Sequence, residues 1–107
     1  MQSKLDLSKL NQFRSKSVLA KFVVPNPVGP DYLFEGKLLF QHKSENGSVL
    51  IKVYESQKGN FIVEDKTEEI PKILVTKDWG NIFGFLGFGD IAKSVYRQLG
   101  VEQFEFV

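Results

Sequence analysis

The 107-residue sequence contains no cysteine and a single histidine, His42. Without cysteine the chain can form no disulfide, no thiolate nucleophile and no cysteine-based zinc or iron–sulfur site. One imidazole is also too few for a metal site built on paired histidines. We therefore expect no metal and no cofactor, and the lack of disulfides fits a reducing, cytoplasmic location.

Long apolar runs are missing as well. Residues 1–7 lack the unbroken apolar stretch of a secretory signal. The most apolar stretch, around Phe83, is interrupted by glycines well short of the roughly 20 residues that a membrane span needs. The net charge is only +1, so the chain as a whole has no electrostatic preference for nucleic acid or membrane surfaces. We expect a cytoplasmic protein that does not bind membranes.

Aromatic side chains, in contrast, are abundant, at 13% of the residues with ten phenylalanines. Each ring buries a large apolar area, so a compact core of large side chains is expected. A chain of this length split in two would leave pieces too small to bury a core without disulfides or metal. We therefore predict one domain over residues 1–107.

The N-terminal end has the pattern of a basic amphipathic helix. Ser3-x-x-Asp6 resembles a helix capping box, and apolar residues then recur every three positions from Leu7 to Phe13. We predict such a helix within residues 1–16.

Basic side chains gather at this same end and suggest a nucleic-acid partner. Cations in one segment can lie along phosphates, and exposed rings such as Tyr32 or Tyr54 can stack on bases. The alternative is that the cations form only the solvated side of the helix. The candidate residues are Lys4, Lys9, Arg14, Lys16 and Lys21.

Residues 32–66 carry the clearest pattern of secondary structure. Apolar and polar side chains alternate from residue 32 onward, as in a half-buried strand, and this alternation places Leu38 and Phe40 on the same face. Asn46-Gly47 and Lys58-Gly59-Asn60 are typical of tight hairpin turns. The pattern predicts three antiparallel strands in a β-meander over residues 32–66.

The C-terminal part combines a glycine-rich aromatic stretch with a helix. Residues 90–99 place apolar side chains on one helical face, with Asp90 as the cap and Gly100 after the last turn. Residues 79–89 alternate glycine with aromatic residues and are predicted to form a Gly/Phe-rich loop. Residues 101–107 alternate as a closing strand would.

The segment Gly87-x-Gly89-x-x-Ala92 resembles the phosphate-binding turn of a dinucleotide-binding βαβ unit, as in Rossmann-type dehydrogenases. The resemblance implies a nucleotide-binding enzyme with Gly87 and Gly89 at the cofactor. Such a unit needs parallel strands, whereas the hairpin signals upstream specify antiparallel neighbours. The Asp90 carboxylate would also compete for the helix amides that a phosphate needs. We therefore favour a structural role for the two glycines and no cofactor.

The same stretch can also be interpreted as an interaction surface. Large rings on a glycine-rich segment can dock into a partner, and aromatic residues are enriched at binding hot spots. The alternative is that these rings pack on the sheet. The candidate residues are Trp79, Phe83, Phe85 and Phe88.

We predict an α+β fold: an antiparallel β-meander sheet of about four to six strands, with an N-terminal and a C-terminal helix packed on one face. Apolar side chains fall on both faces of the meander, so the second face calls for a partner. The sequence favours a small non-enzymatic protein-interaction module that associates with itself or another protein through the second sheet face or the Phe-rich loop. Nucleic-acid binding through the basic N-terminal segment is the alternative, and a nucleotide-binding enzyme is the third hypothesis.

Overall fold

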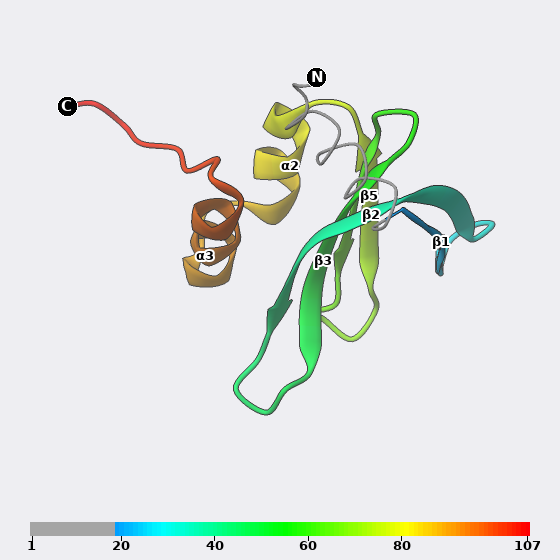
Figure 1. The fold of residues 1–107 in the computed structure, drawn as a ribbon. Coiled ribbons are helices and arrows are strands. Elements are labelled where there is room, and N and C mark those ends of the chain that lie inside the picture. The colour runs from blue at the N-terminus through cyan, green and yellow to red at the C-terminus, as the bar shows by residue number, and fades with distance from the viewer. Residues whose placement is uncertain (1–18) are drawn as a thin grey trace, which may run out of the picture.

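The structure, a computed structural model, describes residues 19–107. Five antiparallel strands form one sheet in chain order, and two helices follow them (Figure 1). The α+β class and the antiparallel meander are therefore confirmed. Neither helix of the described residues is long and apolar enough to cross a membrane. The elements are β1 (Ala20–Val24), β2 (Tyr32–Lys43), β3 (Val49–Ser56), β4 (Phe61–Asp65), β5 (Lys72–Thr76), α2 (Trp79–Leu86) and α3 (Asp90–Leu99).

Two glycines shape the tight turns on either side of β3. Gly47 at φ 88° and Gly59 at φ 89° adopt the left-handed conformation that other residues rarely tolerate. The amide of Gly47 donates to the carbonyl of Ser44, and that of Gly59 donates to the carbonyl of Ser56, both at 2.9 Å. Both turns therefore reverse the chain as the sequence predicts.

An irregularity in β2 changes which face its side chains occupy. Leu38 pairs with Tyr54, whereas Phe40, two positions later, pairs with Val53. Because the adjacent residues Val53 and Tyr54 point to opposite faces, Leu38 and Phe40 do so as well. The prediction that Leu38 and Phe40 share a face is wrong, because the bulge between them shifts the register.

Both helices pack on one side of the sheet, here called the helix face. The buried core on this face combines Val53 and Val63 from neighbouring strands, Ile82 from α2, and Val95 and Tyr96 from α3. Burying each large side chain of this kind contributes roughly 1.5–3 kcal/mol. The sheet and the two helices are therefore held together by one continuous apolar core.

Helix α2 replaces most of the Gly/Phe-rich loop predicted over residues 79–89, and that prediction is wrong for residues 79–86. Asp78 is the N-cap, and its Oδ1 accepts a hydrogen bond of 2.9 Å from the amide of Gly80. Ile82 is completely buried in the helix-face core. This packing offsets the low helix propensity of glycine, roughly 1 kcal/mol for each.

Helix α3 covers the helix predicted over residues 90–99. It begins at Asp90 as predicted, but the N-cap is Gly89 and not Asp90, which is the first helical residue. Gly100, at φ 76°, ends the helix in the left-handed conformation. Its amide donates to the carbonyl of Arg97 at 3.2 Å.

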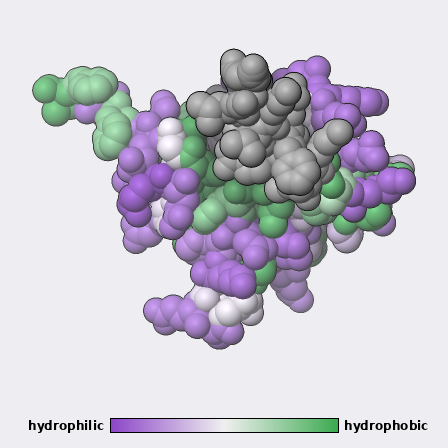
Figure 2. Space-filling view, in the orientation of Figure 1, coloured by the Kyte–Doolittle hydropathy of each residue, from purple (hydrophilic) through white to green (hydrophobic). Residues whose placement is uncertain are grey.

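Residues 101–107 form no strand, so the predicted closing strand is wrong. The segment leaves the end of α3 and projects away from the sheet, as a red trace in Figure 1 and as a mainly green extension in Figure 2. It follows a helix on the helix face and does not meet a sheet edge, where a strand would find hydrogen-bond partners. The helix predicted within residues 1–16 lies outside the described residues.

Candidate binding site on the second sheet face

The face of the sheet opposite α2 and α3, here called the second face, carries its own apolar cluster. Val24, Tyr54 and Ile62 are buried in it. The rings of Phe22, Phe34 and Tyr54 form a triangle with centroid distances of 5.0 to 5.6 Å. Each such ring pair contributes about 0.5–1.5 kcal/mol beyond its buried area. The cluster therefore forms a packed apolar base on this face.

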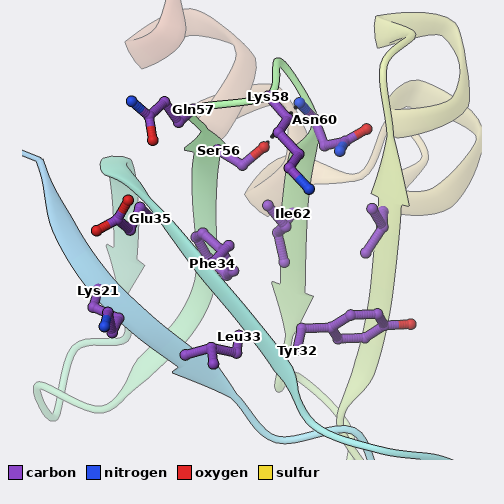
Figure 3. A pocket seen from close by; sticks show the side chains of 11 residues that line it. Lys21, Tyr32, Leu33, Phe34, Glu35, Ser56, Gln57, Lys58, Asn60 and Ile62 are labelled. Atoms are coloured by element: carbon purple, nitrogen blue, oxygen red, sulfur yellow. Dashed lines mark hydrogen bonds between the residues drawn. The ribbon is translucent and has the colours of Figure 1, made fainter.

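A cleft of about 450 Å³ lies on the second face beside this cluster (Figure 3). Strands β2 and β5 contribute its two sides, and the turn between β3 and β4 lies at one end. Its volume falls within the roughly 300–1,000 Å³ of ligand pockets. The apolar lining consists of Tyr32, Leu33, Phe34, Ile62 and Val75.

Polar groups of the β3–β4 turn line the end of the cleft. The amide of Asn60 donates to Ser56 Oγ at 3.1 Å, and the amide of Ser56 donates to the carbonyl of Asn60 at 2.7 Å. These bonds hold the turn in place. Figure 3 shows the Lys58 side chain extending from the turn toward Ile62. The full polar lining is Lys21, Glu35, Ser56, Gln57, Lys58 and Asn60.

The charges around the cleft favour an acidic, partly apolar partner. Two ammonium groups, those of Lys21 and Lys58, line it together with one carboxylate, that of Glu35. Lys21 and Glu35 are cross-strand partners on β1 and β2, whereas Lys58 comes from the β3–β4 turn and has no such acidic strand partner in the lining. An apolar floor bounded by an ammonium group suits a segment that carries both apolar and acidic side chains. Within residues 19–107 no cluster of three or more acidic or histidine side chains could hold a metal ion.

Glu64 is a buried carboxylate on the same face of the sheet. Lys66 Nζ lies 3.6 Å from its Oε2, and Lys52 is its cross-strand partner on β3. Burial raises the pKa of the Tyr54 hydroxyl, and the negative charge of Glu64 raises it further. The Tyr54 hydroxyl therefore ionises at a higher pH than that of an exposed tyrosine.

The four aromatic residues predicted as an interaction surface lie on the helix side. The ring of Trp79 stacks on that of Phe83 with a centroid distance of 6.2 Å, and Phe83 meets Tyr96 edge-on with a centroid distance of 4.9 Å. Trp79, Phe83 and Phe85 all pack against the helix-face core. Phe88 stacks on Phe83 at 6.0 Å and is 51% exposed. The structure thus brings the four rings together, and Phe88 is the most exposed of them.

Gly87 and Gly89 join two helices instead of following a strand. The carbonyl of Gly87 accepts a hydrogen bond of 2.5 Å from the Tyr96 hydroxyl. A second cavity, of about 470 Å³, reaches Gly89 and is lined by Asp65 and Asp90, whose charges would repel a phosphate. The βαβ context implied by the dinucleotide resemblance is therefore absent from residues 19–107.

Of the basic residues considered for nucleic-acid binding, Lys21 alone lies in the described part of the chain, where it is exposed on β1 and lines the cleft. Tyr32 lines the cleft as well, but Tyr54 is buried and its ring cannot stack on a base. The remaining candidates, which lie outside residues 19–107, are Lys4, Lys9, Arg14 and Lys16.

Sequence reasoning did not identify the cleft itself. Lys58, Asn60 and Val75 come from a turn and an edge strand that only the folded sheet brings beside β2. The available signal was the presence of apolar side chains on both faces of the meander. Comparisons of the chain with protein-family models, with curated proteins and with solved structures found no match.

Proposed function

We propose that the chain is a small non-enzymatic interaction module of the cytoplasm that associates with itself through the second face of its sheet. The observation that carries this proposal is the cleft of about 450 Å³, which has an apolar floor and an ammonium group at its end. The buried cluster around Tyr54 supports it, because Phe34 and Ile62 of the cleft pack within that cluster. Both described helices pack on the opposite face, so they do not fill the cleft.

The second face is a better interaction surface than the aromatic segment 79–89. Trp79, Phe83 and Phe85 belong to the helix-face core and stabilise the fold. Phe88 is the exposed member, and a single ring offers less area than the cleft. Val75, in contrast, is 39% exposed and lines the cleft directly.

Substitution of Val75 tests this proposal. In sedimentation equilibrium, Val75→Glu should raise the dissociation constant of self-association at least about tenfold, because an unpaired carboxylate would enter an apolar contact. Phe88→Ser is the matched control on the other surface and should leave the constant unchanged. Circular dichroism checks that both variants keep the fold.

Two results would contradict the proposal. The first is a chain that stays monomeric at every concentration studied. The second is the reverse response, in which Phe88→Ser abolishes association and Val75→Glu does not.

Nucleic-acid binding is a second candidate, because Lys21 and Lys58 line the same cleft as Tyr32 and Phe34. Cations beside rings bind single strands through phosphate contacts and base stacking. Fluorescence anisotropy with single- and double-stranded oligonucleotides at low ionic strength tests it. Binding that weakens with salt and with Lys21→Glu plus Lys58→Glu would support this function, and no binding would exclude it.

A further inference from the structure

The segment after α3 carries aromatic side chains that are largely exposed to solvent. Phe104 is 71% exposed and Phe106 is 96% exposed. Residues 101–107 project from the body of the molecule as a mainly apolar extension (Figure 2). Because exposed rings lose the free energy that burial would provide, this segment favours a partner that covers it.

The order of side chains in this segment suits an extended conformation with two different sides. In an extended chain Phe104 and Phe106 point to one side and Glu105 points to the other. Glu102 lies 3.6 Å from Arg97 and so has a partner at the end of α3. Among the described residues no ion pair involves Glu105, which leaves its charge for an external cation.

The cleft on the second face has the complementary properties. Its floor, which includes Phe34 and Ile62, suits two inserted rings. Lys58 extends from the turn at its end, and its flexible stem lets the ammonium group meet an acidic side chain on the solvent side of a segment whose rings face the floor. We propose that this cleft binds residues 101–107 of a second copy of the chain, with Phe104 and Phe106 on the floor and Glu105 on the solvent side, within reach of Lys58. This inference rests on the proposed function and identifies its partner.

A second copy is required because the segment cannot reach the cleft of its own chain. Val101 packs against the helix-face core, on the opposite side of the sheet from the cleft. Phe104 follows only three residues later, a reach of about 10 Å in extended chain. That distance is about one layer of packed secondary structure, so the ring would not pass around the sheet edge and enter the cleft.

A labelled peptide tests the contact directly. We would titrate a peptide of residues 101–107, with both ends blocked, against the full chain carrying Phe104→Ser and Phe106→Ser, whose own segment cannot compete. Saturable binding is expected. Lys58→Glu in the same chain should weaken it several-fold, and a peptide with both phenylalanines replaced by serine should bind at least about tenfold more weakly.

A charge exchange tests the pairing in the full chain. In sedimentation equilibrium, Lys58→Glu alone and Glu105→Lys alone should each weaken self-association. The double variant should recover much of it, because the two charges are then reversed together. A merely structural role for either residue predicts no recovery.

Failure of this inference can be distinguished from failure of the proposed function. If Val75→Glu disrupts association but the peptide does not bind, the second face remains the interface and the assignment of residues 101–107 is overturned. A peptide of residues 1–18 that displaces the labelled peptide and restores a monomer would also overturn it. If the chain is monomeric and the peptide binds the tail variant but not the wild type, the cleft holds its own segment and the second-copy assignment fails.

Discussion

At Gly36 the backbone of β2 lies directly against that of β3. A Cβ at this position would collide with the carbonyl oxygen of Glu55 and lie 2.8 Å from Ser56 Cα, and neither backbone atom can rotate away. We expect Gly36→Ala to lower the free energy of unfolding by about 2 kcal/mol.

Gly84→Ala is the matched control for that substitution. Gly84 lies in α2 with open space around it, so alanine should stabilise the chain by about 0.5–1 kcal/mol through its higher helix propensity. Urea unfolding measures both changes. Equal effects of the two substitutions would contradict the close approach of β2 and β3.

Two buried tyrosines should make the free energy of unfolding depend on pH in the alkaline range. Burial raises the pKa of Tyr96 above its ordinary 10.0, and burial followed by the charge of Glu64 raises that of Tyr54. Each hydroxyl thus ionises earlier in the unfolded chain than in the folded one. The contribution to stability is fully present below the unfolded pKa and is lost as the pH rises through the folded pKa.

We therefore expect the free energy of unfolding to fall above the unfolded tyrosine pKa of 10.0, and to fall less steeply in Tyr54→Phe and Tyr96→Phe. Tyr96→Phe also loses the hydrogen bond to Gly87 and should cost about 1 kcal/mol at neutral pH. Urea unfolding across the alkaline range measures both effects. If a chain that carries both Tyr54→Phe and Tyr96→Phe loses stability with rising alkaline pH as steeply as the wild type, other groups control this pH dependence.

At the scale of elements, the two C-terminal helices begin in different ways. Asp78 caps α2 through a hydrogen bond to the amide of Gly80, whereas α3 starts after Gly89 without a side-chain cap. Asp78→Ala should destabilise the chain by about 1 kcal/mol, and Asp78→Ser should restore most of that loss. Asp90→Ala is the control: it removes only a favourable charge near the start of α3 and should cost a few tenths to about 1 kcal/mol. Thermal and urea unfolding compare the three variants, and a larger loss for Asp90→Ala would contradict these cap assignments.

At the scale of the whole molecule, self-association should couple to stability. A partner that binds only the folded chain raises the melting temperature as its concentration rises, and under the proposed self-association the partner is a second copy of the chain. We expect the melting temperature of the wild type to increase with protein concentration and that of Val75→Glu to stay constant. Differential scanning calorimetry over a concentration series measures this. A concentration-independent melting temperature for the wild type would contradict an associating module.

The sequence by itself determined the elements whose signals are local. Gly47 and Gly59 specify the turns on either side of β3, because their backbone conformation requires glycine wherever the rest of the chain lies. The helix over residues 90–99 followed from apolar spacing and from Gly100 at its end. Such signals depend on neighbouring residues alone, so the amino-acid sequence is enough to predict them.

Only the tertiary structure decided the features that depend on distant contacts. Helix α2 forms in a glycine-rich stretch because Ile82 is buried against the sheet, and no local propensity announces that burial. The bulge after Leu38 moves Phe40 to the other face because β3 sets the pairing. The cleft joins Lys58 of a turn to Val75 of an edge strand, residues that become neighbours only when the sheet is assembled. Turns and helix periods are encoded by adjacent residues, whereas the faces, the cleft and its charges arise from side chains that packing brings together across the sheet.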